Sequence, residues 1–132
     1  MTMTKVRIRQ AVAHAPYPRW HFLTFAGPDG GESRGIVDLL AIRKDHSPPP
    51  EGLKRGDAFQ IVLIQVKGGY AARPTVEDGN RLRKVARLHR AQGILLASWK
   101  KGAAAKFYTL RPKARAGEPD WTEVENLKSI FC

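Results

Sequence analysis

Gly35-Ile36-Val37-Asp38-Leu39-Leu40-Ala41-Ile42 and Ala58-Phe59-Gln60-Ile61-Val62-Leu63-Ile64-Gln65-Val66-Lys67 are two near-continuous apolar runs. Both are rich in β-branched residues and are bounded by Gly or Pro, which is typical of buried strands. A charged side chain within such a strand is costly unless a partner or a ligand compensates it. Asp38 and Lys67 therefore indicate a functional site in the predicted sheet.

Three polar side chains are expected to meet if these two strands are neighbours. Side chains alternate along a strand, so Gln65 and Lys67 leave the same face, about 7 Å apart, and Asp38 can lie beside them. Mg²⁺ prefers oxygen ligands and keeps several waters. A lysine beside it can activate water and stabilise charge on a phosphate. The alternative is that Asp38 caps a strand end and Lys67 reaches solvent at the sheet edge.

The sequence Gly-Ile-Val-Asp38, followed by a strand that ends in Gln65-Val66-Lys67-Gly68-Gly69, resembles the PD-(D/E)XK nuclease superfamily. The resemblance covers about residues 20–110 and is greatest to Mrr-like, Holliday-junction-resolvase-like and VRR-type members, whose second motif is Gln-X-Lys. It implies a restriction-endonuclease-like α/β fold, in which a central mixed sheet of four to five strands is flanked by helices in αβββαβ order. It also implies a Mg²⁺-dependent endonuclease or deoxyribonuclease, for which Mn²⁺ can substitute.

The resemblance assigns roles to individual residues. Asp38 and Gln65 would hold the metal, the Val66 carbonyl would add a ligand, and Lys67 would assist the attacking water. Residues 1–28 contain no acid where the family places a glutamate, so Glu32 is a candidate further ligand and equally a turn residue. The proline of the family motif is absent, and Gln65 leaves one firm anionic ligand. A nucleic-acid-binding module with weak or no activity is therefore the alternative function.

Composition points to the same kind of partner. The 132-residue chain carries 23 basic and 12 acidic residues, a net charge of +11, which predicts binding to a polyanion such as nucleic acid, with DNA expected and a homodimer possible. The length fits one domain, residues 1–132. With Cys132 as the single cysteine, an intrachain disulfide and a cysteine-based zinc site are excluded. No long apolar run or signal-peptide core is present, which favours a cytoplasmic protein without membrane association.

A basic helix is predicted from Thr75 to about Gln92, with Thr75 and Asp78 as its N-terminal cap and Gly93 as its C-terminal cap. The apolar face is expected to contain Leu82, Val85, Ala86 and His89. The residues predicted to contact phosphates are Arg83, Lys84, Arg87 and Arg90 on the helix, with Lys100 and Lys101 in a later turn. A solvated charged face is the alternative.

The remaining segments complete the predicted fold. Residues 20–25 should form a strand antiparallel to the Asp38 strand through a turn at 27–31. Residues 94–99 should form a strand parallel to the Lys67 strand through a right-handed crossover. Residues 5–15 are compatible with a strand or a helix, and the loop at 43–57 with a DNA-facing or a solvated segment. A short helix is predicted over residues 121–130, with Asp120 as a cap.

Overall fold

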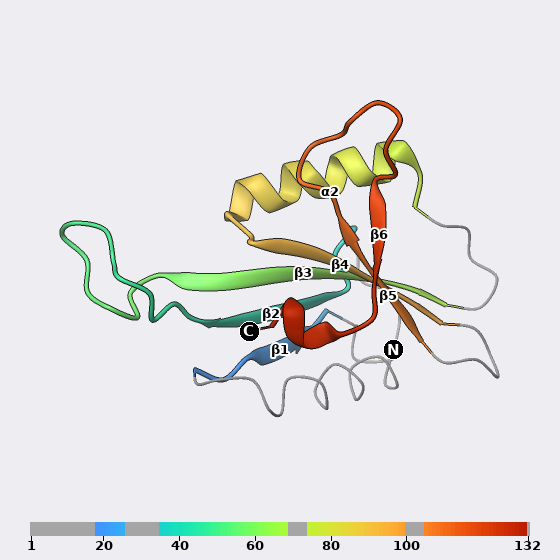
Figure 1. Ribbon diagram of the computed structural model, residues 1–132. Coiled ribbons are helices and arrows are strands. Elements are labelled where there is room, and N and C mark those ends of the chain that lie inside the picture. Colours follow the sequence, from blue (N-terminus) through green and yellow to red (C-terminus); the bar gives the residue numbers. More distant parts are fainter. Residues whose placement is uncertain (1–17, 26–34, 69–73, 100–104, 132) are drawn as a thin grey trace.

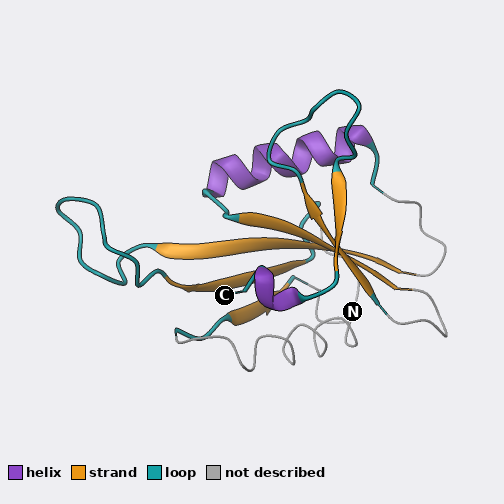
Figure 2. Cartoon of the chain, viewed as in Figure 1, coloured by secondary structure: helices purple, strands orange, loops and turns teal. Residues whose placement is uncertain are grey.

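The computed structural model describes residues 18–25, 35–68, 74–99 and 105–131. They form a six-stranded sheet in the order β1-β2-β3-β4-β5-β6, with a long helix, α2, on one face and a short 3₁₀ helix, η1, on the other (Figures 1 and 2). The elements are β1 His21–Thr24, β2 Leu39–Lys44, β3 Phe59–Gly68, α2 Val76–His89, β4 Gly93–Trp99, β5 Lys106–Leu110, β6 Trp121–Val124 and η1 Leu127–Ser129.

The sheet is mixed, which confirms the predicted α/β class. β3 and β4 pair in parallel through the α2 crossover, and each of the other neighbouring pairs is antiparallel, including β1 with β2. The described residues form six strands in this sheet, where four to five were expected. The segment at 5–15 and the turn at 27–31 lie outside the described residues, so those two predictions stay open.

Each face of the sheet packs in its own apolar cluster. Val62 and Ile64 of β3 join the cluster on the η1 face, together with Trp20, Leu39, Ala41, Leu95, Ala97, Phe107, Leu127 and Phe131. The cluster on the α2 face contains Ile36, Leu82, Ile94 and Leu110, with Val37, Val85, Ala86 and Trp121 against it. Because side chains alternate along β3, Leu63, Gln65 and Lys67 face the α2 side.

Helix α2 begins as predicted and ends earlier than predicted. Asp78 N–H donates to Thr75 Oγ1 (3.1 Å) and Thr75 N–H to Asp78 Oδ2 (3.0 Å), which confirms the capping box. At the other end the cap is Arg90, at φ 52°, and Gly93 is already the first residue of β4. The prediction of a Gly93 cap was wrong because Gly93 pairs with Val62, so the helix must stop in time for β4 to begin.

The helix predicted over residues 121–130 was also wrong. Trp121–Val124 pairs as β6 with the free edge of β5, and only Leu127–Ser129 is helical, as η1. The apolar residues at helical spacing serve different faces: Trp121 packs on the α2 side, whereas Leu127 and Ile130 pack on the η1 side. Backbone hydrogen bonding to an open strand edge outweighs a weak periodicity in so short a segment.

Arg83 joins α2 to the loop between β5 and β6. It is 5% exposed, and its guanidinium donates to Arg111 O (2.8 Å), Asn80 Oδ1 (3.0 Å) and Asp120 Oδ1 (2.9 Å). Asp120 is therefore an ion-pair partner and not the helix cap that was predicted. The expectation that Arg83 is exposed for phosphate contact was wrong, because its charge is paired inside the fold.

Within the described ranges, no helix is both long and apolar enough to cross a membrane.

We expect Asp120→Ala to lower the free energy of unfolding by about 2–3 kcal/mol, since it leaves a buried guanidinium without its carboxylate. Glu118→Ala is the matched control: it breaks the more exposed pair with Arg111 (2.7 Å) and should cost under about 1 kcal/mol. Urea denaturation followed by tryptophan fluorescence measures both. Equal losses in the two variants would contradict a structural role for the Arg83–Asp120 pair.

Candidate active site

Asp38 is held against β3 by its backbone and by its side chain. Its N–H donates to Ile64 O (2.9 Å), and its Oδ2 accepts from Val66 N–H (2.7 Å). Its carbonyl accepts from Phe25 N–H (3.4 Å), one position beyond the end of β1. The carboxylate thus takes the place of a backbone acceptor where the β2–β3 ladder ends. These contacts place Asp38 beside residues 64–66, as the sequence predicted.

Gln65 carries a buried oxygen without a partner. The residue is 6% exposed, and Oε1 is the one buried side-chain nitrogen or oxygen in the described ranges that has no hydrogen bond. Leaving such a group unpaired costs about 1–3 kcal/mol, so native proteins rarely retain one without a reason. An amide oxygen has no proton to donate. This atom can therefore accept a hydrogen bond, for example from water, or coordinate a cation.

Lys67 and the Val66 carbonyl complete the group. Lys67 is half-buried and lies on the same face as Gln65, two residues further along β3. The N–H and C=O of one strand residue point toward the same neighbouring strand, so the Val66 carbonyl faces the side on which Asp38 lies. The last residues of β3 therefore carry an amide oxygen, a carbonyl and an ammonium group, with the Asp38 carboxylate bound to the same strand at Val66.

This donor set fits a hard divalent cation. Mg²⁺ is commonly held by one or two carboxylates with waters and substrate oxygens in the remaining positions. The described part of the chain contains no group of three His, Cys, Asp or Glu side chains that could hold a metal. Within the described residues, a site at Asp38 therefore has fewer than three such side chains, and the unpartnered Gln65 Oε1 is a neutral oxygen that could add to the shell. Glu32 lies outside the described residues, so its candidacy as a ligand is untested.

The basic residues that were predicted to contact phosphates differ in exposure and in position. Lys84, Arg87 and Arg90 are exposed on α2, in contrast to the buried Arg83. Arg87 and Arg90 are at the end of the helix close to the start of β4 (Figure 1). Lys100 and Lys101 fall outside the described residues. Three of the four basic residues predicted at the helix are therefore exposed, and Arg83 is not.

Two polar residues that the sequence did not single out share a row with Lys67. Ser98 of β4 is its paired neighbour, and Lys106 of β5 pairs in turn with Ser98. Both lie in segments recognisable as strands, but their alignment with Lys67 depends on the register of two successive pairings. No local sequence signal specifies that register.

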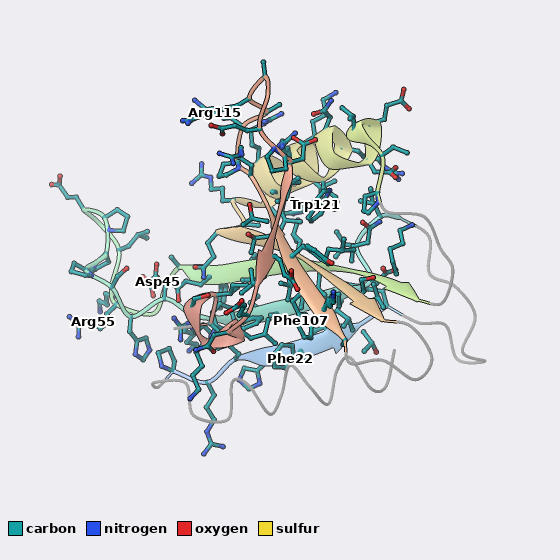
Figure 3. The ribbon with its side chains drawn as sticks, turned by 45° about the vertical axis from the view of Figure 1, so that its right-hand side comes forward. Phe22, Asp45, Arg55, Phe107, Arg115 and Trp121 are labelled. Carbon is teal, nitrogen blue, oxygen red and sulfur yellow. The ribbon has the colours of Figure 1, made fainter. Side chains whose placement is uncertain are left out.

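The loop between β2 and β3 is locally ordered by Asp45. Asp45 Oδ1 accepts from Ser47 N–H (2.9 Å) and Ser47 Oγ–H (2.6 Å), and these hydrogen bonds lower the pKa of the Asp45 carboxyl. Asp45 N–H donates to Ala58 O, and Gly56 N–H to Asp45 O. The loop extends beyond the sheet at the end where α2 finishes (Figure 1), and Arg55 lies on it (Figure 3).

Comparison with known proteins adds a structural likeness. No protein-family model matches the sequence, and no curated protein matches it. Among solved structures, the chain is similar to Hjc of Archaeoglobus fulgidus, a Holliday junction resolvase from an archaeal hyperthermophile. The sequences are 17% identical, the TM-score is 0.49, and the alignment covers 98% of this chain and 88% of that one.

We expect Gln65→Met to raise the free energy of unfolding by about 1 kcal/mol in EDTA, because it replaces an unpaired buried oxygen with an apolar group of similar size. Gln60→Met on the same strand is the matched control. Gln60 Oε1 accepts from Arg43 Nε (2.6 Å), and losing that bond should lower stability. Urea denaturation measures both variants. Destabilisation by Gln65→Met of the same size as by Gln60→Met would show that Gln65 Oε1 has a partner.

Proposed function

We propose that the protein is a divalent-metal-dependent nuclease that hydrolyses phosphodiester bonds in DNA. The observation that carries the proposal is the group at the end of β3. There Val66 N–H binds the carboxylate of Asp38, Gln65 on one side of Val66 keeps an unpartnered buried oxygen, and Lys67 follows on the other side. A buried oxygen kept without a donor is costly in a purely structural role, and a metal shell accounts for it.

In this proposal Asp38 and Gln65 hold Mg²⁺, Mn²⁺ can substitute, the Val66 carbonyl adds a ligand, and Glu32 is a further candidate. When bound, the cation would polarise a phosphate oxygen and offset the negative charge that develops on the phosphate. The Lys67 ammonium orients the attacking water and donates hydrogen bonds to the phosphate oxygens. Asp38 can accept a hydrogen bond from that water through the oxygen that is not bound to Val66.

The overall charge supports a nucleic-acid substrate. The chain carries a net charge of +11, and Lys84, Arg87 and Arg90 are exposed on the face of the sheet that also holds Gln65 and Lys67. Basic groups on the same face of the sheet as a hydrolytic site raise the local concentration of a polyanion and hold its backbone. DNA in the cytoplasm is the substrate that we propose, with a second copy of the chain as a possible partner.

A nucleic-acid-binding module without hydrolytic activity is the second candidate. Two observations favour it: Asp38 Oδ2 is already bound to Val66 N–H, and the described residues contain no group of three His, Cys, Asp or Glu side chains that could hold a metal. Both would be found if Asp38 only caps the strand end. Activity assays therefore decide between the two functions.

Lys67→Ala should abolish Mg²⁺-dependent cleavage while leaving folding and DNA binding largely intact, because the ammonium acts on the water and the transition state. Asp38→Asn should do likewise, since an amide oxygen can still accept from Val66 N–H but brings no charge to the metal. Lys106→Ala is the matched control: it removes one positive charge from β5, two strands away from Lys67 in the row Lys67–Ser98–Lys106. Gel assays on linear, branched and single-stranded DNA and RNA measure cleavage. Wild-type protein that cuts none of them in Mg²⁺ or Mn²⁺ would leave the binding module as the function.

Gln65→Glu should bind Mn²⁺ or Mg²⁺ more tightly than wild type in the absence of DNA, because it adds a second anion of similar length to the metal shell. In EDTA this variant should be less stable than wild type, since its carboxylate lies near that of Asp38, with Lys67 offsetting part of the repulsion. Melting temperature with and without metal reports both effects. Gln60→Glu, at the far end of β3, should show no metal-dependent stabilisation. A Gln65→Glu melting temperature that ignores divalent cations would place Gln65 outside the metal shell.

A further inference from the structure

A basic cavity lies at the opposite end of the α2 face from Lys67. It has a volume of about 410 Å³ and is formed by the last turns of α2, the start of β4 and the beginning of the loop after β5. Its lining includes Arg87, Arg90, Gly93 and Pro112. Lys113 and Arg115 follow Pro112 on the same loop and are exposed, and Arg115 is marked in Figure 3. We call Arg87, Arg90, Lys113 and Arg115 the distal basic surface.

The acidic residues nearby are already paired. Asp120 binds Arg83 (2.9 Å), and Glu118 binds Arg111 (2.7 Å). No ion pair in the described part of the chain involves any of the four residues of the distal basic surface. Two exposed arginines, Arg87 and Arg90, therefore line the hollow, and two exposed cations, Lys113 and Arg115, follow its lining residue Pro112 along the loop, none of them in an ion pair within the described residues. Such a surface attracts an anion with several negative charges.

Helix stabilisation explains only part of this charge. A cation in the last turn of a helix interacts favourably with the helix dipole, which accounts for a basic residue at Arg87. Arg90, however, has φ 52°, a conformation in which Gly or Asn is the usual cap. Lys113 and Arg115 belong to another segment and owe nothing to that dipole. A ligand shared by the helix and the loop accounts for all four residues.

The distance to the candidate active site limits what that ligand can be. Gly93 pairs with Val62, and Lys67 pairs with Ser98, so five residues of β4 separate the two rows. At the usual rise per residue this is about 17 Å along the strands. Phosphates of one DNA strand are about 3.4 Å apart along the helix axis. A duplex that touches both places must therefore extend over at least about five base pairs.

We propose that the distal basic surface binds backbone phosphates of the same nucleic-acid molecule that occupies the candidate active site. Only the part of the inference that concerns the active-site end rests on the proposed function. It assigns an extended nucleic acid as the substrate class, held at two places about 17 Å apart through phosphates and hence without regard to base sequence. Arg87 and Arg90 are the anchoring residues at the far end, and Lys113 and Arg115 extend the surface along the loop.

The test measures binding without cleavage. A fluorescent 16-base-pair duplex is titrated in EDTA at several salt concentrations with wild type and with Arg87→Gln/Arg90→Asn, in which Asn suits the cap conformation. Loss of two phosphate contacts should flatten the log–log salt slope by about 1.8 and weaken binding on the order of 10- to 60-fold at 0.1 M salt. The control variant, Arg19→Gln/Lys128→Gln, removes the same net charge next to Trp20 and Leu127 on the η1 face and should keep the wild-type slope. Melting temperatures show whether each variant folds.

Stoichiometry tests whether one molecule spans both ends. At saturation we expect no more than one duplex per chain, whereas two duplexes per chain would overturn the spanning arrangement. A folded Arg87→Gln/Arg90→Asn variant with the wild-type salt slope would overturn the distal basic surface itself. Neither result depends on hydrolysis. If Lys67→Ala abolishes cleavage but Arg87→Gln/Arg90→Asn keeps the wild-type salt slope, only the present inference is refuted. A flattened slope in a protein that cuts nothing would support the surface and refute the nuclease.

Discussion

The parallel pairing of β3 with β4 is the constraint on which the arrangement of this protein depends. It runs from Val62 opposite Gly93 to Gly68 opposite Trp99, and it requires a crossover that returns the chain to the other end of the sheet. Helix α2 provides that return and covers one face of the sheet. The crossover places the end of β3 and the end of α2 at opposite ends of the same face. Candidate catalytic groups collect at the first place and exposed arginines at the second.

The end of β3 combines satisfied and unsatisfied polar groups in a way that favours function over stability. Asp38 replaces a backbone acceptor for Val66 and so holds the ladder together at its last position. Gln65, between Ile64 and Val66, keeps a buried oxygen without a donor. A methionine of similar size would pack there at no polar cost. Retaining an amide at this position therefore makes physical sense if the oxygen receives its partner from outside the chain.

Basic residues of α2 divide into structural and surface groups because of a single neighbouring loop. Arg83 faces the loop after β5, loses its exposure, and is compensated by Asp120 and by two further acceptors. Arg87, one turn further along, is exposed and belongs to no ion pair within the described residues. The same side-chain type thus fixes the helix to the sheet at one position and remains available to a ligand at the next. Net charge alone does not distinguish these uses.

Local sequence determined the elements of this fold whose signals are strong: the two apolar strands around Asp38 and Lys67, the capping box of Thr75 and Asp78, and the α/β class. It failed where tertiary contacts outweigh a short-range pattern. Residues 121–130 have helical spacing, yet Trp121–Val124 completes the edge of β5 because an open edge offers backbone partners. The tertiary structure likewise decided three further features: the burial of Arg83, the alignment of Lys67 with Ser98 and Lys106, and the unpartnered Gln65 oxygen. Each depends on strand register or on a partner tens of residues away. A local sequence pattern does not specify which distant segment a strand or side chain will contact.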